Sequence, residues 1–98
     1  MTKVIYREYG DYRYLAAKGH ATGDDEKICA GISAIMYALA GFLTNEHGIH
    51  VNAIQLESGD AVIEAGDTER LKAAFDMALI GLMQLARKWP EYVEIDIQ

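Results

Sequence analysis

The chain has 98 residues, 51% of them hydrophobic and 24% charged, which suits one globular domain over residues 1–98 with a thin core. Its net charge of −6 argues against a protein that grips nucleic acid phosphates and fits a basic protein or peptide partner better. The N-terminal residues lack the apolar core of a signal peptide, and no run of about 18 apolar residues occurs, so we expect a cytoplasmic protein that does not engage a membrane.

The first predicted element is a β-hairpin. β-Branched and aromatic residues fill Lys3–Tyr9 and Tyr12–Ala17, and the Gly10-Asp11 pair between them is a turn signal. The tyrosines of this hairpin are Tyr6, Tyr9, Tyr12 and Tyr14. They resemble a stacking surface for nucleobases, but few lysines and arginines accompany them, so packing of aromatic side chains across the two strands is favoured.

A long helix is predicted from Ile28 to about Asn45. Large apolar side chains recur in it at helical spacing, and small side chains form a second stripe. The large ones are Ile28, Ile32, Ile35, Leu39 and Phe42, and the small ones are Ala30, Ala34, Ala38 and Gly41. The small stripe predicts close contact either with another helix of the chain or with another subunit.

The second half of the chain repeats the order of hairpin and helix. The alternating segments Ile49–Leu56 and Ala61–Ala65 flank a turn at Ser58-Gly59-Asp60. A second helix then runs from an N-cap at Asp67 or Thr68 to about Trp89. Its core stripe is Leu71, Phe75, Ala78, Leu82 and Leu85, and a second stripe contains Met77, Ile80 and Met83. Little of its middle is therefore expected to face water.

The alternating segment Tyr92–Ile97 predicts a closing strand, after the stop signal at Pro90. The resulting order is ββαββαβ. We expect a single-domain α/β sandwich in which both helices pack on one mainly antiparallel sheet. Because both helices are apolar on more than one face and the core is thin, a homodimer is a reasonable expectation.

The only cysteine, Cys29, follows His20 across the short acidic loop Ala21–Lys27. His20 is expected at a strand end and Cys29 in the first turn of a helix. Backbone N–H groups at a helix N-terminus favour negative charge, so a thiolate forms most easily there. A thiolate beside an imidazole is a nucleophile for acyl transfer, although a buried structural cysteine gives the same spacing.

Metal binding is a second interpretation, because His47 and His50 are spaced as His-x-x-His and Cys29 is also a zinc ligand type. His47 lies at the opposite end of the predicted helix, about 27 Å from Cys29. The two histidines therefore cannot share a metal ion with Cys29. We expect no metal and no other cofactor.

Gly19-His20-Ala21, followed after the loop by Ile28-Cys29-Ala30-Gly31-Ile32-Ser33-Ala34, resembles the signature of the ribosomal-processing cysteine protease family Prp. The order of predicted elements also resembles that family's small α/β fold. The His-to-Cys loop is shorter than in the family pattern, and it has Lys27 where the pattern has an apolar residue. This predicts a trimmed segment over the substrate.

The resemblance implies a Cys29/His20 dyad, with Cys29 as nucleophile and His20 as its base, supported by Ser33 and by the backbone at Ala30. It implies a cysteine endopeptidase that removes a short N-terminal extension from a large-subunit ribosomal protein, cutting an apolar stretch that precedes basic residues. The alternative is a catalytically inactive homodimeric interaction protein with the same fold, in which the trimmed loop reflects lost activity.

Overall fold

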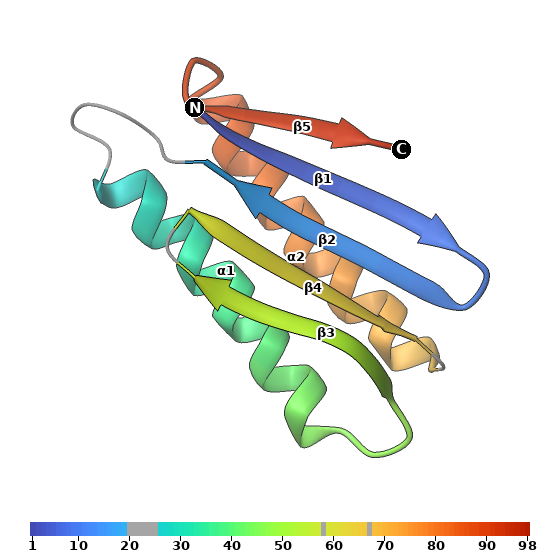
Figure 1. Cartoon of the computed structure of the whole chain (residues 1–98). Coiled ribbons are helices and arrows are strands. Elements are labelled where there is room, and N and C mark those ends of the chain that lie inside the picture. Colours follow the sequence, from blue (N-terminus) through green and yellow to red (C-terminus); the bar gives the residue numbers. More distant parts are fainter. Residues whose placement is uncertain (20–25, 58, 67) are drawn as a thin grey trace.

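The computed structural model describes residues 1–19, 26–57, 59–66 and 68–98. Within these residues, two helices lie on one face of a five-stranded sheet (Figure 1). The elements in chain order are β1 (Thr2–Tyr9), β2 (Tyr12–Lys18), α1 (Glu26–Asn45), β3 (His50–Glu57), β4 (Asp60–Gly66), α2 (Glu69–Lys88) and β5 (Val93–Ile97). The predicted order ββαββαβ and the predicted α/β sandwich are confirmed.

The strand order across the sheet is β3-β4-β2-β1-β5. Neighbouring strands are antiparallel except β1 and β5, which run parallel with Thr2 opposite Val93 and Tyr6 opposite Ile97. The backbone N–H of Thr2 also donates to the carbonyl of Tyr92 at 2.8 Å. The two ends of the described chain are therefore joined in one ladder.

A β-bulge interrupts β3. The pairing of β3 with β4 shifts between Val51 and Ala53, which leaves Asn52 as an extra residue. Because side chains alternate between the two faces of a strand, the extra residue changes which positions point toward the helices. After the bulge, Ile54 lies opposite the fully buried Ile63, whereas Val51 before it is 38% exposed.

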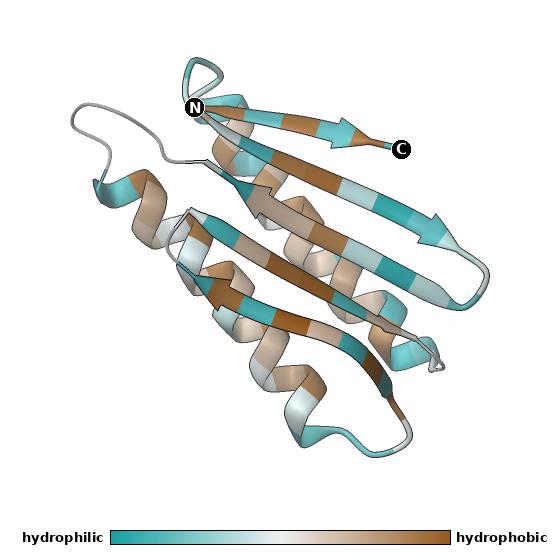
Figure 2. Ribbon diagram, viewed as in Figure 1, coloured by the Kyte–Doolittle hydropathy of each residue, from teal (hydrophilic) through white to brown (hydrophobic). Residues whose placement is uncertain are grey.

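The core lies between the helices and the sheet. Brown apolar positions alternate with teal polar ones along the strands in Figure 2, as one buried face requires. The largest fully buried side chains are Val4, Leu15, Met36, Ile63, Leu71, Phe75 and Leu82. They come from three strands and from both helices, so one continuous core holds the layers together.

The two helices pack closely at glycines. A Cβ atom at Gly81 would lie 3.0 Å from Ile35 Cδ1, and one at Gly31 would lie 3.4 Å from Leu85 Cδ1. In the small stripe predicted from sequence, Ala30, Ala34 and Ala38 are exposed in the single chain. Contact of this stripe with another subunit, the second alternative, stays a prediction.

The core stripe of α2 is confirmed, with Leu71, Phe75, Ala78 and Leu82 all buried. Thr68 is the N-cap, and its side chain accepts a hydrogen bond from the Leu71 N–H at 3.1 Å. The expectation that little of the middle of α2 faces water is wrong for the single chain. Met77, Ile80 and Met83 are 76%, 56% and 39% exposed, because the sheet lies on the other side of the helix.

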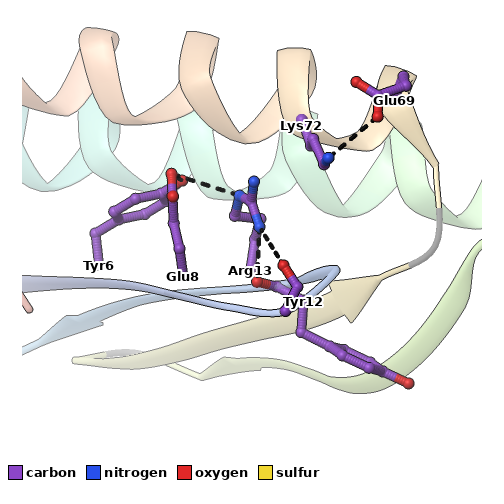
Figure 3. Close-up of polar contacts among 7 residues, drawn as sticks. Tyr6, Glu8, Tyr12, Arg13, Glu69 and Lys72 are labelled. Carbon is purple, nitrogen blue, oxygen red and sulfur yellow. Dashed lines mark hydrogen bonds and ion pairs between the residues drawn. The ribbon is translucent and has the colours of Figure 1, made fainter.

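The tyrosines of the first hairpin separate onto the two faces of the sheet. Tyr9 and Tyr12 stack across the strands with ring centroids 5.7 Å apart, which confirms aromatic packing for that pair. Tyr6 instead faces the helices and donates a 2.8 Å hydrogen bond to Glu8 (Figure 3). Glu8 also lies 3.5 Å from Nε of the buried Arg13. Burial, and then the hydrogen bond to Glu8, raises the pKa of Tyr6 to about 12.

Candidate functional site

Cys29 lies in the first turn of α1 and is half-buried. It borders a cavity of about 80 Å³ where the start of α1 meets the ends of several strands. The described lining residues are Thr2, Ala17, Gly19, Cys29, Ile32, Ser33, Met36, Glu57, Gly59, Asp60 and Ala61. The first turn of α1 and the strand ends thus leave a small space beside Cys29.

The end of β2 is fixed tightly beside this cavity. The Gly19 N–H donates to the carbonyl of Gly59 at 2.8 Å, and Lys18 Nζ lies 2.7 Å from Asp60 Oδ1. Gly19 has φ +91°, and a Cβ atom there would lie 2.6 Å from the Met1 carbonyl oxygen. Only glycine fits this position. The contacts with Gly59 and with Met1 therefore fix the position of Gly19 at the end of β2.

Cys29 and Ser33 are brought together as predicted, one helical turn apart on the same cavity wall. Ala30 lies next to Cys29 but its side chain is exposed and does not line the cavity. His20 lies outside the described residues, as do Ala21–Asp25 of the predicted loop Ala21–Lys27. The last two residues of that loop, Glu26 and Lys27, already belong to α1. Gly19, the residue before His20, borders the cavity.

The remaining histidines lie far from this site. His50 is on β3, beyond the C-terminal end of α1, and its ring meets Tyr12 edge-on at 6.2 Å. His47 follows the end of α1 and is exposed. Among the described residues, no three histidine, cysteine or carboxylate side chains gather as a metal site would require.

Sequence reasoning missed the contribution of the β3–β4 hairpin, which supplies Glu57, Gly59, Asp60 and Ala61 to the cavity. The turn itself was predicted. Its position beside Cys29 depends on β4 pairing with β2, with Lys18 opposite Asp60, and no local pattern indicates that pairing.

A family model described as "Cysteine protease Prp" matches residues 1–94. A comparison with curated protein sequences finds no match. Among solved structures, the chain is similar to the essential ribosomal processing protease Prp from S. aureus in complex with a covalently linked product peptide, with a TM-score of 0.83 and 17% identity over all of both chains. The same S. aureus protease in complex with a substrate peptide gives a TM-score of 0.84 and 16% identity, again over all of both chains.

SMU.848 from Streptococcus mutans is also similar, with a TM-score of 0.76 and 22% identity over all of this chain and 99% of that one. At these identities the structural likeness shows a shared fold. The expected fold class is therefore confirmed by solved structures as well as by the arrangement of the strands and helices.

Proposed function

We propose, because this chain belongs to the cysteine protease Prp family, that it cleaves peptide bonds with Cys29 as nucleophile and His20 as base. The observation that carries the proposal is the position of Cys29, half-buried at a helix N-terminus and bordering a cavity beside Gly19. His20 follows Gly19 directly in the chain. Both residues also stand at the matching places of the family signature.

In the proposed mechanism, the Cys29 thiolate attacks the carbonyl carbon of the scissile peptide bond. Backbone N–H groups of the first turn of α1, near Cys29 and Ala30, stabilise the negative charge that develops on the carbonyl oxygen. His20 donates a proton to the leaving amine as the C–N bond breaks. Water then hydrolyses the thioester and regenerates the thiol. Ser33, on the same wall, supports the position of the reacting group.

The proposed substrate is the N-terminal extension of a large-subunit ribosomal protein, cut in an apolar stretch that precedes basic residues. The similar S. aureus protein is described as a ribosomal processing protease, and the net charge of −6 suits a basic target. A ribosomal substrate places the proposed reaction in the cytoplasm.

The test is cleavage of a peptide that has an apolar, aromatic-containing segment before a lysine-rich tail, followed by mass spectrometry. Wild-type protein is expected to cut once, whereas Cys29→Ala and His20→Ala are expected to lose at least about 1000-fold in kcat/KM, as removal of a member of a catalytic unit does. Thr44→Ala, an exposed change near the C-terminal end of α1 and outside the cavity lining, is the control and should retain activity.

A second measurement is the rate at which iodoacetamide alkylates Cys29. The wild-type thiol should react faster than the free thiol of a short unstructured peptide, and His20→Ala should slow it. Inert wild-type protein together with an unreactive thiol would exclude the protease and leave the inactive interaction protein as the interpretation.

We also propose that the protein forms a homodimer through the outer faces of the two helices. A groove of about 550 Å³ between α1 and α2 is lined mainly by apolar and small side chains, including Ala38, Ala74 and Gly81. Met77 borders this groove, and Ile80 is exposed on the same helix. A two-fold axis lets the projecting side chains of one copy fill the groove of the other.

A further inference from the structure

A second cavity, of about 210 Å³, adjoins the cavity beside Cys29 and shares four of its lining residues. Its lining residues are Ser33, Met36, Tyr37, Leu56, Glu57 and Ala61. Together the two cavities form a groove between α1 and the β3–β4 hairpin, which we call the Tyr37 groove. The groove therefore begins at the proposed nucleophile and leads away from it along α1.

We infer that the Tyr37 groove is a substrate subsite that accepts one apolar side chain of an extended peptide. This inference rests on the proposed protease function and names residues that set its specificity. A cavity of about 210 Å³ is below the volume of roughly 300–1000 Å³ that whole small ligands occupy, so it suits a single side chain.

The chemistry of the lining supports an apolar occupant with a polar neighbour. Met36 is almost fully buried, Leu56 is half-buried, and Tyr37 is 60% exposed at the rim. An apolar side chain entering the groove thus meets a thioether, an aliphatic side chain and a ring. Tyr37 is an exposed aromatic side chain that would lose contact with water on binding, which is typical of an anchor residue at an interface.

The position of the groove predicts which substrate residue it reads. Ser33 and Tyr37 lie four and eight residues after Cys29 in α1, or about 6 and 12 Å along a helix. An extended peptide advances by about 3.3 Å per residue. The side chain in the groove therefore belongs to a residue about two to four positions from the scissile bond.

Glu57 gives the groove its charge. It is exposed, and among the described residues no lysine, arginine or histidine forms an ion pair with it, whereas the nearby Asp60 pairs with Lys18. Its carboxylate accepts a 3.5 Å hydrogen bond from Gln55 Nε2. β3 is also the edge of the described sheet, so its outer backbone groups are open to an added extended segment. The expected occupant is a peptide with an apolar residue near a basic one.

The experiment measures kcat/KM for a set of peptides in which each residue of the apolar segment is replaced in turn by alanine. For the wild type, alanine at one position two to four residues from the cut should reduce kcat/KM about 10- to 100-fold. With the parent peptide, Tyr37→Ala should have a kcat/KM lower than wild type by a similar factor. For this variant, replacing the same peptide residue by alanine should then lower kcat/KM by less than about 3-fold. Tyr37→Phe should retain the wild-type profile.

The matched control is Tyr9→Ala, which removes another exposed tyrosine from the β1–β2 hairpin, at the end of the sheet remote from the start of α1 (Figure 1). It should retain the wild-type profile. Glu57→Gln should reduce kcat/KM roughly 2- to 5-fold for a peptide with lysine near the apolar residue, and leave its norleucine counterpart unchanged.

The two possible failures differ. If wild type cuts the peptides and Tyr37→Ala shows the same positional profile, the subsite is wrong and the protease stands. If no peptide is cut and Cys29 shows no enhanced alkylation, the proposed function is wrong and the subsite falls with it.

Discussion

Tyr6, Glu8 and Arg13 form a polar cluster under the helices, at the end of the sheet away from Cys29. One carboxylate oxygen of Glu8 accepts from Tyr6 and lies 3.5 Å from Arg13 Nε, and Arg13 also donates to the Tyr12 carbonyl at 3.0 Å. Tyr6 is only 4% exposed. A tyrosinate at this position would be both desolvated and beside a carboxylate, which is why the neutral phenol is favoured.

This cluster predicts a loss of stability at high pH. Below pH 10 Tyr6 is protonated in the folded and the unfolded chain, so the neutral phenol makes its full contribution to the free energy of unfolding. Between pH 10 and about 12 the unfolded chain releases the proton while the folded chain keeps it, so the free energy of unfolding falls as pH rises. Wild type should lose up to about 2 kcal/mol more than Tyr6→Phe across this range, measured by urea unfolding. A constant difference between the two proteins would contradict this.

Gly19 is the second residue with a specific requirement, since its positive φ and its closeness to Met1 both exclude a side chain. Gly19→Ala should reduce the free energy of unfolding by at least about 2 kcal/mol. It should also slow peptide cleavage, because Gly19 borders the cavity beside Cys29.

Gly10→Ala is the matched control for Gly19→Ala. Gly10 also has a positive φ, of +58°, but a Cβ atom there has no described atom within 4 Å. Gly10→Ala should reduce the free energy of unfolding, measured in urea, by about 1 kcal/mol and leave the rate of peptide cleavage unchanged. Equal losses for the two variants would show that the contact with Met1 is unimportant.

At the scale of elements, the helices and most strands were predictable because apolar residues recur in each at the spacing typical of a helix or of a strand. The Thr68 cap and the Leu71 to Leu82 stripe lie where the pattern indicated them. The bulge at Asn52 was not predictable, because it reverses the phase of β3 without a glycine or proline to mark it. Tyr6 and Tyr9 are three residues apart on one strand, so alternation of side chains places them on opposite faces of the sheet. Treating the tyrosines of the hairpin as one aromatic group overlooks this.

The candidate site was predictable in part for the same reason. Cys29 and Ser33 belong to one helix, so their spacing places them on one face. Glu57 and Asp60 come from a hairpin about 30 residues later in the chain, and only the long-range pairing of β4 with β2 brings them to Cys29. No local signal indicates such a pairing.

At the scale of the molecule, the exposed apolar face of the helices predicts the state in solution. Sedimentation velocity is expected to give a dimer for the wild type. Ile80→Asp should raise the dimer dissociation constant at least about 10-fold, because a carboxylate would be buried without a partner. Ile97→Asp is the matched control, since Ile97 is 59% exposed on β5, against 56% for Ile80 on α2. A dimer unaffected by Ile80→Asp would place the interface elsewhere.

The parallel pairing of β5 with β1 has a consequence for how the chain folds. The outer edge of β1 pairs only with β5, so Thr2 has no ladder partner on that side until Val93, 91 residues later, has been synthesised. A growing chain on the ribosome therefore holds β1 with an open edge until β5 has emerged. Premature termination before Val93 should leave a species that exposes this edge and aggregates. The edge of β1 is therefore covered only when the last strand of the fold is in place.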